Sequence, residues 1–347
     1  MDDLIAVRQD ERFDAGALAA WMASVGGLPG GVPEVTQFSG GKANLTYLLA
    51  FPDGTELVLR RPPLGPLAEG SHDMAREHRV LSRLWRSFDK APRAVALCEN
   101  ESVIGTRFFL MERRPGVVVR GQVPEGFGGG DDADANKKLS SVVIDTLAEL
   151  HAVDPDSCDL GDLGHPDGYL KRQVEGWSRR WDNARFDEVP VADEVAVWLA
   201  GHMPVSPPPT LIHNDWRLDN MAVSPDDPGV CVAVYDWDMA TRGDPLTDLG
   251  TLMGTWFDLG EAPPELSMMP TTAPGWLTRA DAVERYARLT GDDLESIDWY
   301  LVFGAWKMGV ILAQIHIRWL RGQTKDERFA TLGDGAKHLF DLAASRR

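Results

Sequence analysis

The order of hydrophobic and polar residues predicts strands in the first third of the chain. Between residues 35 and 61 short apolar runs flank the turn PDGT at 52–55, which is typical of a β-hairpin because glycine readily adopts the positive φ of a tight reversal. Two further strand-like runs follow before residue 114, AVALCEN and SVIGTRFFLMERR. Together these segments predict a small lobe built around a sheet.

Other segments carry apolar residues at helical spacing. This spacing predicts helices over residues 10–25, 71–87 and 137–155. Ser71 is the expected N-cap of the second helix. Residues 121–136 are rich in Gly and Asp and predict an exposed loop. The rest of the chain is predicted to be mainly helical, except for strand-like runs around residues 209–237.

The most apolar late segment spans residues 299–320 and is long enough to cross a bilayer. Four polar residues interrupt it: Lys307, Gln314, His316 and Arg318. These interruptions favour a buried amphipathic helix over a membrane span. The chain is therefore expected to have no membrane partner.

Length and composition add two expectations. A chain of 347 residues exceeds what one compact core usually organises, so we expect two lobes, residues 1–114 and 115–347. The net charge of −18 argues against a nucleic-acid partner, because binding to phosphate backbones requires clustered cations.

The cysteines and the N-terminus suggest a compartment. Three widely spaced cysteines without a CxxC pair predict neither a disulfide framework nor a zinc site. The N-terminal residues are acidic and lack the apolar core of a signal peptide. We therefore expect a cytoplasmic protein, either a monomer or a homodimer.

Polar residues are concentrated in LIHNDWRLDNMAV, residues 211–223, between apolar flanks. Asp215 is followed by Arg217 two positions later and by Asn220 five positions later. Phosphoryl transfer from ATP requires this combination on one loop, because a carboxylate accepts the hydroxyl proton, an amide oxygen binds magnesium and a cation neutralises the phosphoryl group. His213 is expected to brace the loop backbone.

A second polar group follows the apolar run VAVY. Asp236 comes directly after this predicted strand, and Asp238 lies two positions further on. Magnesium prefers carboxylate and phosphate oxygens, so Asp236 is expected to bind the metal together with Asn220.

These motifs resemble those of the aminoglycoside phosphotransferase family. His213, Asp215 and Asn220 match its HxDxxxxN catalytic loop, and residues 236–238 match its IDW(E/D) element. The sequence around these motifs is most similar to the branch associated with acyl-CoA dehydrogenases, which includes the kinase domains of acyl-CoA dehydrogenase family members ten and eleven. The resemblance implies an α+β, protein-kinase-like fold with a small β-rich nucleotide lobe and a larger, mainly helical lobe.

The resemblance also implies roles for residues outside these motifs. Residues 39–44 take the place of the loop that covers the nucleotide. The residues expected to contact the nucleotide there are Ser39, Gly40, Gly41, Lys42 and Asn44. Arg60 takes the place of the phosphate-binding lysine, and Glu77 that of its helix partner. The hinge beside adenine would be formed by Met111, Glu112 and Arg113. Asp248 is expected to support the catalytic loop.

The expected activity is an ATP- and magnesium-dependent small-molecule kinase acting on a hydroxyl acceptor. The family name and the charge of −18 favour an aminoglycoside, whereas the branch suggests a hydroxy acid or a hydroxyacyl-CoA. Seven arginines are candidates for binding such an anion, although all of them are also typical of solvated surface: Arg113, Arg114, Arg120, Arg172, Arg179, Arg180 and Arg185.

Two other classes of function are compatible with the sequence. A pseudokinase would bind nucleotide without catalysis, but it has no need of the base Asp215. A metal-dependent hydrolase built on His213, Asp215, Asp236 and Asp238 would bind a transition metal tightly, whereas a kinase would bind magnesium together with nucleotide.

Overall fold

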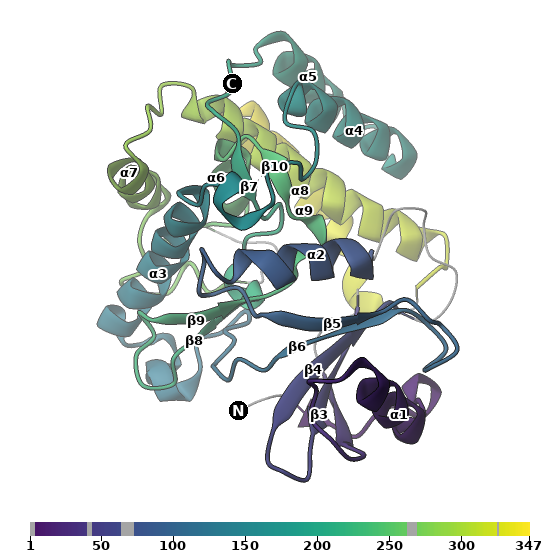
Figure 1. Ribbon diagram of the computed structural model, residues 1–347. Coiled ribbons are helices and arrows are strands. Elements are labelled where there is room, and N and C mark those ends of the chain that lie inside the picture. The colour runs from purple at the N-terminus through teal and green to yellow at the C-terminus, as the bar shows by residue number, and fades with distance from the viewer. Residues whose placement is uncertain (1–3, 40–43, 64–72, 262–268, 325) are drawn as a thin grey trace. The chain divides into compact units, whose positions relative to one another are not determined.

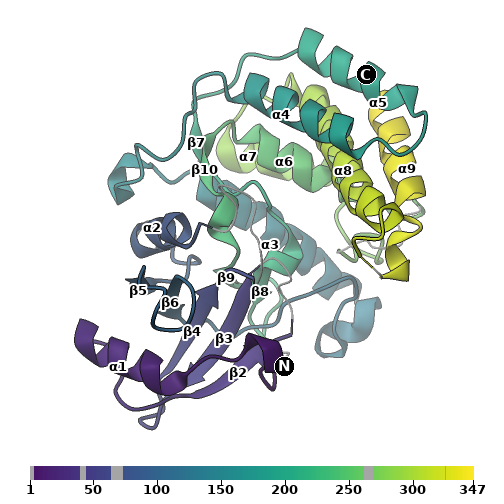
Figure 2. The same ribbon diagram turned by 90° about the vertical axis from the view of Figure 1, so that its right-hand side faces the viewer.

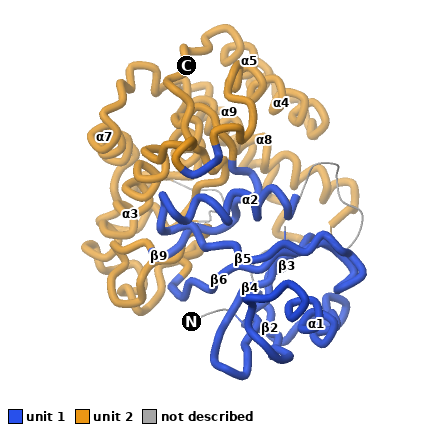
Figure 3. Tube along the Cα trace, in the orientation of Figure 1, with its two compact units in different colours: residues 1–117, 158–160, 232–240 blue, residues 118–157, 161–231, 241–347 orange. Residues whose placement is uncertain are grey.

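The computed structural model describes residues 4–39, 44–63, 73–261, 269–324 and 326–347 (Figure 1). It divides into two compact units, which Figure 3 distinguishes by colour. Unit 1 contains residues 1–117, 158–160 and 232–240, and unit 2 contains the rest. The first unit thus extends three residues past the expected boundary at 114, and it also includes two later segments that the sequence did not predict.

Unit 1 is built on a six-stranded antiparallel sheet with the order β1-β2-β3-β4-β6-β5. Its strands are β1 (Leu4–Ile5), β2 (Glu34–Phe38), β3 (Leu45–Ala50), β4 (Glu56–Arg61), β5 (Ala94–Cys98) and β6 (Phe108–Glu112). The predicted hairpin joins β3 to β4: Gly54 has a φ of 85°, and the Thr55 N–H donates to the Asp53 carboxylate at 2.8 Å. This hairpin aligns Arg60 with Thr46.

Two helices cover opposite faces of this sheet, as Figure 2 shows. Helix α1 (Ala15–Val25) packs Leu18 and Met22 into an apolar cluster with Tyr47 and Leu59. Helix α2 (Met74–Leu84) covers the other face and brings Glu77 to Arg60. Its N-cap is Asp73, whose side chain accepts from the N–H groups of residues 75 and 76. The expected cap, Ser71, lies outside the described residues.

Unit 2 is mainly helical. Its helices are α3 (Ala133–His151), α4 (Tyr169–Ala184), α5 (Pro190–Gly201), α6 (Leu246–Met253), α7 (Arg279–Thr290), α8 (Ile297–Leu320) and α9 (Leu332–Ala344). The short strands after α5 are β7 (Thr210–Ile212), β8 (Met221–Val223), β9 (Cys231–Val234) and β10 (Thr241–Gly243). Strands β7 and β10 pair antiparallel, and β9 carries the chain from unit 2 into unit 1.

The loop expected over residues 121–136 is only partly a loop. A 3-10 segment spans Glu125–Gly130, and α3 already begins at Ala133. The reason is that Asp132 is an N-cap: its carboxylate accepts from the N–H groups of Asp134 and Ala135, both at 3.0 Å. The acidic composition therefore marks the start of a helix as well as a solvated turn.

Helix α8 is the core helix of unit 2. It is the one helix in the described part of the chain that is long and apolar enough to cross a membrane, but most of its apolar stretch is buried inside the protein. Helix α6 lies directly against it, because a Cβ on Gly304 would collide with the backbone of Gly250. This close approach holds Asp248 of α6 and Lys307 of α8 near the same loop.

Candidate active site

The loop after β7 brings together the three residues predicted for phosphoryl transfer. The Asn220 Nδ2 atom donates to the Asp215 side chain and also to its backbone carbonyl, both at 2.9 Å. Arg217 lies 3.2 Å from the same carboxylate oxygen, Oδ2. No hydrogen bond to the other oxygen of Asp215 is found among the described residues, and the side chain is 35% exposed. Asp215 can therefore accept a proton from a bound hydroxyl.

The amide of Asn220 is oriented by these contacts. Because its nitrogen donates to Asp215, its oxygen is directed elsewhere. An amide oxygen is a ligand that magnesium accepts, so the observed orientation fits the predicted role of Asn220.

The backbone before Asp215 is held by a buried carboxylate. Asp248 accepts from the N–H of His213 at 2.6 Å and from the N–H of Asn214 at 2.8 Å. These bonds stabilise the positive φ of 68° at Asn214. Burial raises the pKa of Asp248, but hydrogen bonds and charge from His151 and His213 outweigh it and lower the pKa. The expectation that Asp248 supports the loop is confirmed, and His213 braces Asp215 through Nδ1 at 3.3 Å.

In unit 1, Arg60 joins two acidic side chains. Its Nε donates to Glu77 at 2.8 Å, and its terminal nitrogen pairs with Asp236. Arg61, the adjacent residue, points to the opposite face of the sheet and donates to the Tyr47 hydroxyl. Arg60, and not Arg61, therefore faces Glu77. Burial lowers the pKa of Arg60, but the charges of Glu77, Asp236 and Asp238 outweigh it, so the guanidinium stays charged.

Asp236 has an unusual backbone conformation. Its φ of 65° lies in the left-handed region, which a residue with a side chain adopts at a cost. The next residue fixes this turn, because the Trp237 indole donates to the Val234 carbonyl at 2.7 Å. Asn44, an expected nucleotide contact, lies 3.5 Å from Asp238. Unit 1 therefore presents carboxylate oxygens beside a fixed cation, which fits the binding of magnesium and phosphate.

Comparison with known proteins identifies the family. The sequence model of the APH family, described as the phosphotransferase enzyme family, matches residues 34–299. The chain belongs to this family. Its members are small-molecule phosphotransferases, and they use ATP.

Individual proteins show how similar this chain is to members of the family. Acyl-CoA dehydrogenase family member 11 of Gallus gallus is 31% identical over 92% of this chain, which spans 42% of that protein's length. The structure of a Ralstonia eutropha protein described as an aminoglycoside phosphotransferase is 29% identical, with a TM-score of 0.82 over 96% of this chain and 98% of that one. Spectinomycin phosphotransferase, solved with ADP and spectinomycin, shares the fold at 11% identity, with a TM-score of 0.55 over 96% and 99% of the chains. The predicted branch and α+β fold are confirmed.

The other predicted nucleotide contacts of this family member are only partly described. Gly40, Gly41 and Lys42 lie outside the described residues, while the Ser39 carbonyl accepts from Arg8 at 3.5 Å. Met111 and Glu112 form the end of β6, where the Glu112 carboxylate accepts from the N–H of Arg93 at 2.9 Å.

Arg113 follows β6 and pairs with Glu56 on the neighbouring strand. The roles of these residues toward nucleotide stay predictions.

Lys307 is a residue of this site that sequence reasoning missed. Its ammonium lies 3.3 Å from both the Asn214 carbonyl and the Thr251 hydroxyl, and the side chain is buried. Burial lowers its pKa, although the charges of Asp248 and Asp215 oppose this shift. The available signal was a lysine within the most apolar late segment, which we interpreted, together with three other polar residues, only as evidence against a membrane span.

The side chains that could act as metal ligands do not support a metal-dependent hydrolase. The described residues contain no group of three or more His, Cys, Asp or Glu side chains that could hold a metal ion. His213 uses Nδ1 within its own loop instead. The oxygen donors of Asn220 and Asp236 suit a hard cation better than a transition metal.

The buried carboxyl group of Glu77 leads to a prediction about pH. Burial, together with the charges of Asp236 and Asp238, outweighs Arg60 and raises the pKa of Glu77 from 4.5 to about 7. Between these values the folded chain retains a proton that the unfolded chain releases, so the free energy of unfolding should fall as pH rises through this range. Urea unfolding of wild type and Glu77→Gln between about pH 5 and pH 8 would measure this slope.

The variant Glu77→Gln should show a smaller slope, because it removes the titrating group. Added magnesium and nucleotide should also flatten the wild-type slope, since a cation at Asp236 offsets the negative charge that raises the pKa of Glu77. Equal slopes in wild type and variant without ligand would contradict the assignment.

Proposed function

We propose that this chain transfers the γ-phosphoryl group of ATP, with magnesium, to a hydroxyl of a small molecule. The observation that carries this proposal is the carboxylate of Asp215, held by Asn220 and Arg217 through one of its oxygens only. A pseudokinase would need nucleotide contacts but no such base. Asp215 therefore favours a catalytic protein over one that only binds nucleotide.

The proposed step balances without a further reactant. The acceptor oxygen forms a bond to the γ-phosphorus while the bond from that phosphorus to the β–γ bridging oxygen breaks, and ADP leaves. Asp215 accepts the hydroxyl proton. Magnesium, held by Asn220 and Asp236, would neutralise charge on the phosphate oxygens.

The chain's own cations have separate tasks in this proposal. Arg60, fixed by Glu77 at 2.8 Å, binds phosphate oxygens of the nucleotide. Arg217, beside Asp215, stabilises charge on the transferred group. Both side chains are already held by neighbouring carboxylates, so little reorganisation is required when substrate binds.

We further propose that the acceptor is a hydroxy acid or a hydroxyacyl-CoA. The support is the relative in Gallus gallus, which is named for acyl-CoA dehydrogenase and matches 92% of this chain. An aminoglycoside is the second candidate, because a chain with a charge of −18 attracts polycations and the Ralstonia eutropha protein carries that description.

Acceptor-dependent formation of ADP tests both candidates. The purified chain would be assayed with ATP and magnesium against panels of hydroxyacyl-CoA compounds, free hydroxy acids and aminoglycosides, with phosphorylated products identified by mass spectrometry. We expect turnover with the first or second panel and loss of turnover in Asp215→Ala. Turnover with aminoglycosides alone would overturn the acceptor assignment, and a lack of turnover with every panel would overturn the proposed function.

A further inference from the structure

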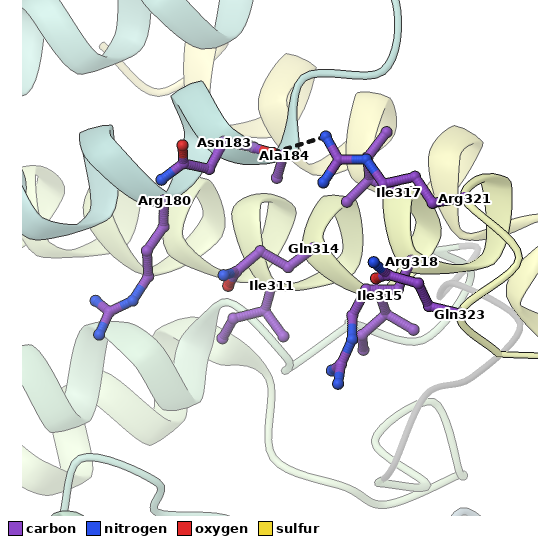
Figure 4. A pocket seen from close by; sticks show the side chains of 10 residues that line it. All are labelled: Arg180, Asn183, Ala184, Ile311, Gln314, Ile315, Ile317, Arg318, Arg321 and Gln323. Atoms are coloured by element: carbon purple, nitrogen blue, oxygen red, sulfur yellow. Dashed lines mark hydrogen bonds between the residues drawn. The ribbon is translucent and has the colours of Figure 1, made fainter. Parts of the chain in front are cut away.

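Unit 2 contains a pocket between α4 and α8 that the catalytic loop does not form. Its volume is about 470 Å³, which is within the usual range for small-molecule sites. Isoleucines of α8 contribute apolar surface, and three arginines contribute charge: Arg180, Arg318 and Arg321. Figure 4 shows the side chains of Arg180 and Arg318 on either side of Ile311 and Gln314, with Arg321 turned toward Asn183.

The charge of this pocket is opposite to that of the whole chain. Acidic residues outnumber basic ones by 53 to 35, yet no Asp or Glu is among the described residues that line the pocket. Nor do Arg180 and Arg318 form an ion pair with a carboxylate anywhere in the described ranges. Guanidinium groups bind phosphate and carboxylate through two parallel hydrogen bonds. The pocket therefore favours an anionic ligand with an apolar portion.

A chain of contacts inside unit 2 links this pocket to the catalytic loop. The Arg180 guanidinium lies 4.4 Å from the centre of the Trp177 ring, and the Lys307 ammonium lies 5.4 Å from the same centre. Lys307 in turn donates to the carbonyl of Asn214, which precedes Asp215. Two buried side chains, Trp177 and Lys307, therefore link the lining of the pocket to the loop of the proposed base by direct packing.

Helix α8 shows how far the pocket extends from Lys307 along the helix axis. Lys307, Ile311, Ile315 and Arg318 are spaced three or four residues apart, so they follow one face of the helix. The first and the last lie eleven positions apart, a rise of about 16 Å along the axis. A short hydroxy acid is shorter than this rise, so an acceptor that extends from the loop beside Lys307 to Arg318 has to be long.

We propose that this pocket binds the phosphate-bearing end of a long acceptor whose hydroxyl is phosphorylated at Asp215. Arg180 and Arg318 contact the anionic groups, and Ile311 and Ile315 contact the apolar part. This inference rests on the proposed function and selects the longer of its two acceptor classes. Arg318 also lies in the last helical turn, where a cation complements the helix dipole. A purely structural role of that kind would affect stability but not ligand binding.

Calorimetric titration of the full chain with coenzyme A tests the pocket without catalysis. A non-hydrolysable ATP analogue and magnesium would be present throughout to occupy the nucleotide site. We expect wild type to bind coenzyme A and the double variant Arg180→Gln/Arg318→Gln to bind it about tenfold or more weakly, since each charged hydrogen bond contributes substantially. Pantetheine, which lacks phosphate, should bind wild type and variant equally.

Arg288→Gln is the matched control. It removes an exposed arginine of α7 in the same unit, which pairs with Glu284 at the surface and does not line the pocket, so it should leave the affinity for coenzyme A within about twofold. Equal affinity in wild type and double variant, or no binding to wild type, would overturn the pocket assignment even if an acceptor is phosphorylated. Arginine-dependent binding without turnover of any acceptor would support the pocket and overturn the proposed function instead.

Discussion

Asp215→Asn is expected to lower the acceptor-dependent kcat by about a thousandfold, within the range for loss of a general base. The amide has nearly the shape of the carboxylate, but it cannot accept the hydroxyl proton. The Asn220 and Arg217 contacts to Asp215 involve hydrogen bonding as well as charge, so the loop should remain folded. Initial rates with ATP and the identified acceptor would measure the change.

Two controls separate this loss from a binding defect. The KM for ATP should change little in Asp215→Asn, because the proposed nucleotide contacts are other residues. Asp226→Asn, in the exposed turn between β8 and β9, changes the same charge and should keep wild-type kcat. A variant Asp215→Asn that retains acceptor-dependent turnover would remove the base from the proposed mechanism.

Local signals were sufficient to predict the elements that frame this site. The hairpin at 52–55, the strands around the polar loop and the helices α2, α3 and α8 all follow from turn residues and apolar spacing. The motif spacing also anticipated the cluster of Asp215, Arg217 and Asn220, because five residues on one loop cannot lie far apart. Alternation along β4 places Arg60 and Arg61 on opposite faces of the sheet but does not say which of them faces α2. The contact between Arg60 and Glu77 shows that it is Arg60.

Contacts between distant segments could not be predicted in the same way. Lys307 reaches Asn214 across 93 positions, through a close approach of α6 and α8 that two glycines permit. Nothing in the local pattern around Lys307 specifies that neighbour. The inclusion of residues 232–240 in unit 1 could not be predicted either. It depends on hydrogen bonds between distant segments, such as the one from the Val234 N–H to the Lys90 carbonyl at 2.8 Å.

Asp248→Ala is expected to lower both stability and activity. The substitution removes the carboxylate that accepts from the N–H groups of His213 and Asn214, and each lost hydrogen bond costs about 1–3 kcal/mol. We therefore expect the free energy of unfolding to fall by about 2–5 kcal/mol. Because these N–H groups define the backbone next to Asp215, kcat should fall more than the KM for ATP rises. Urea unfolding and initial rates, measured at a temperature where the variant is folded, would test this.

Asp244 supplies a control for instability alone. It is buried four residues earlier and accepts from the Tyr300 hydroxyl at 2.6 Å and from the Leu246 N–H at 3.0 Å, with no hydrogen bond to residues 213–220 in the described structure. Asp244→Ala should therefore destabilise the chain by a comparable amount while the folded fraction keeps a kcat close to that of wild type. If both variants lose kcat equally, the effect of Asp248 reflects general instability and its positioning of the catalytic loop is refuted.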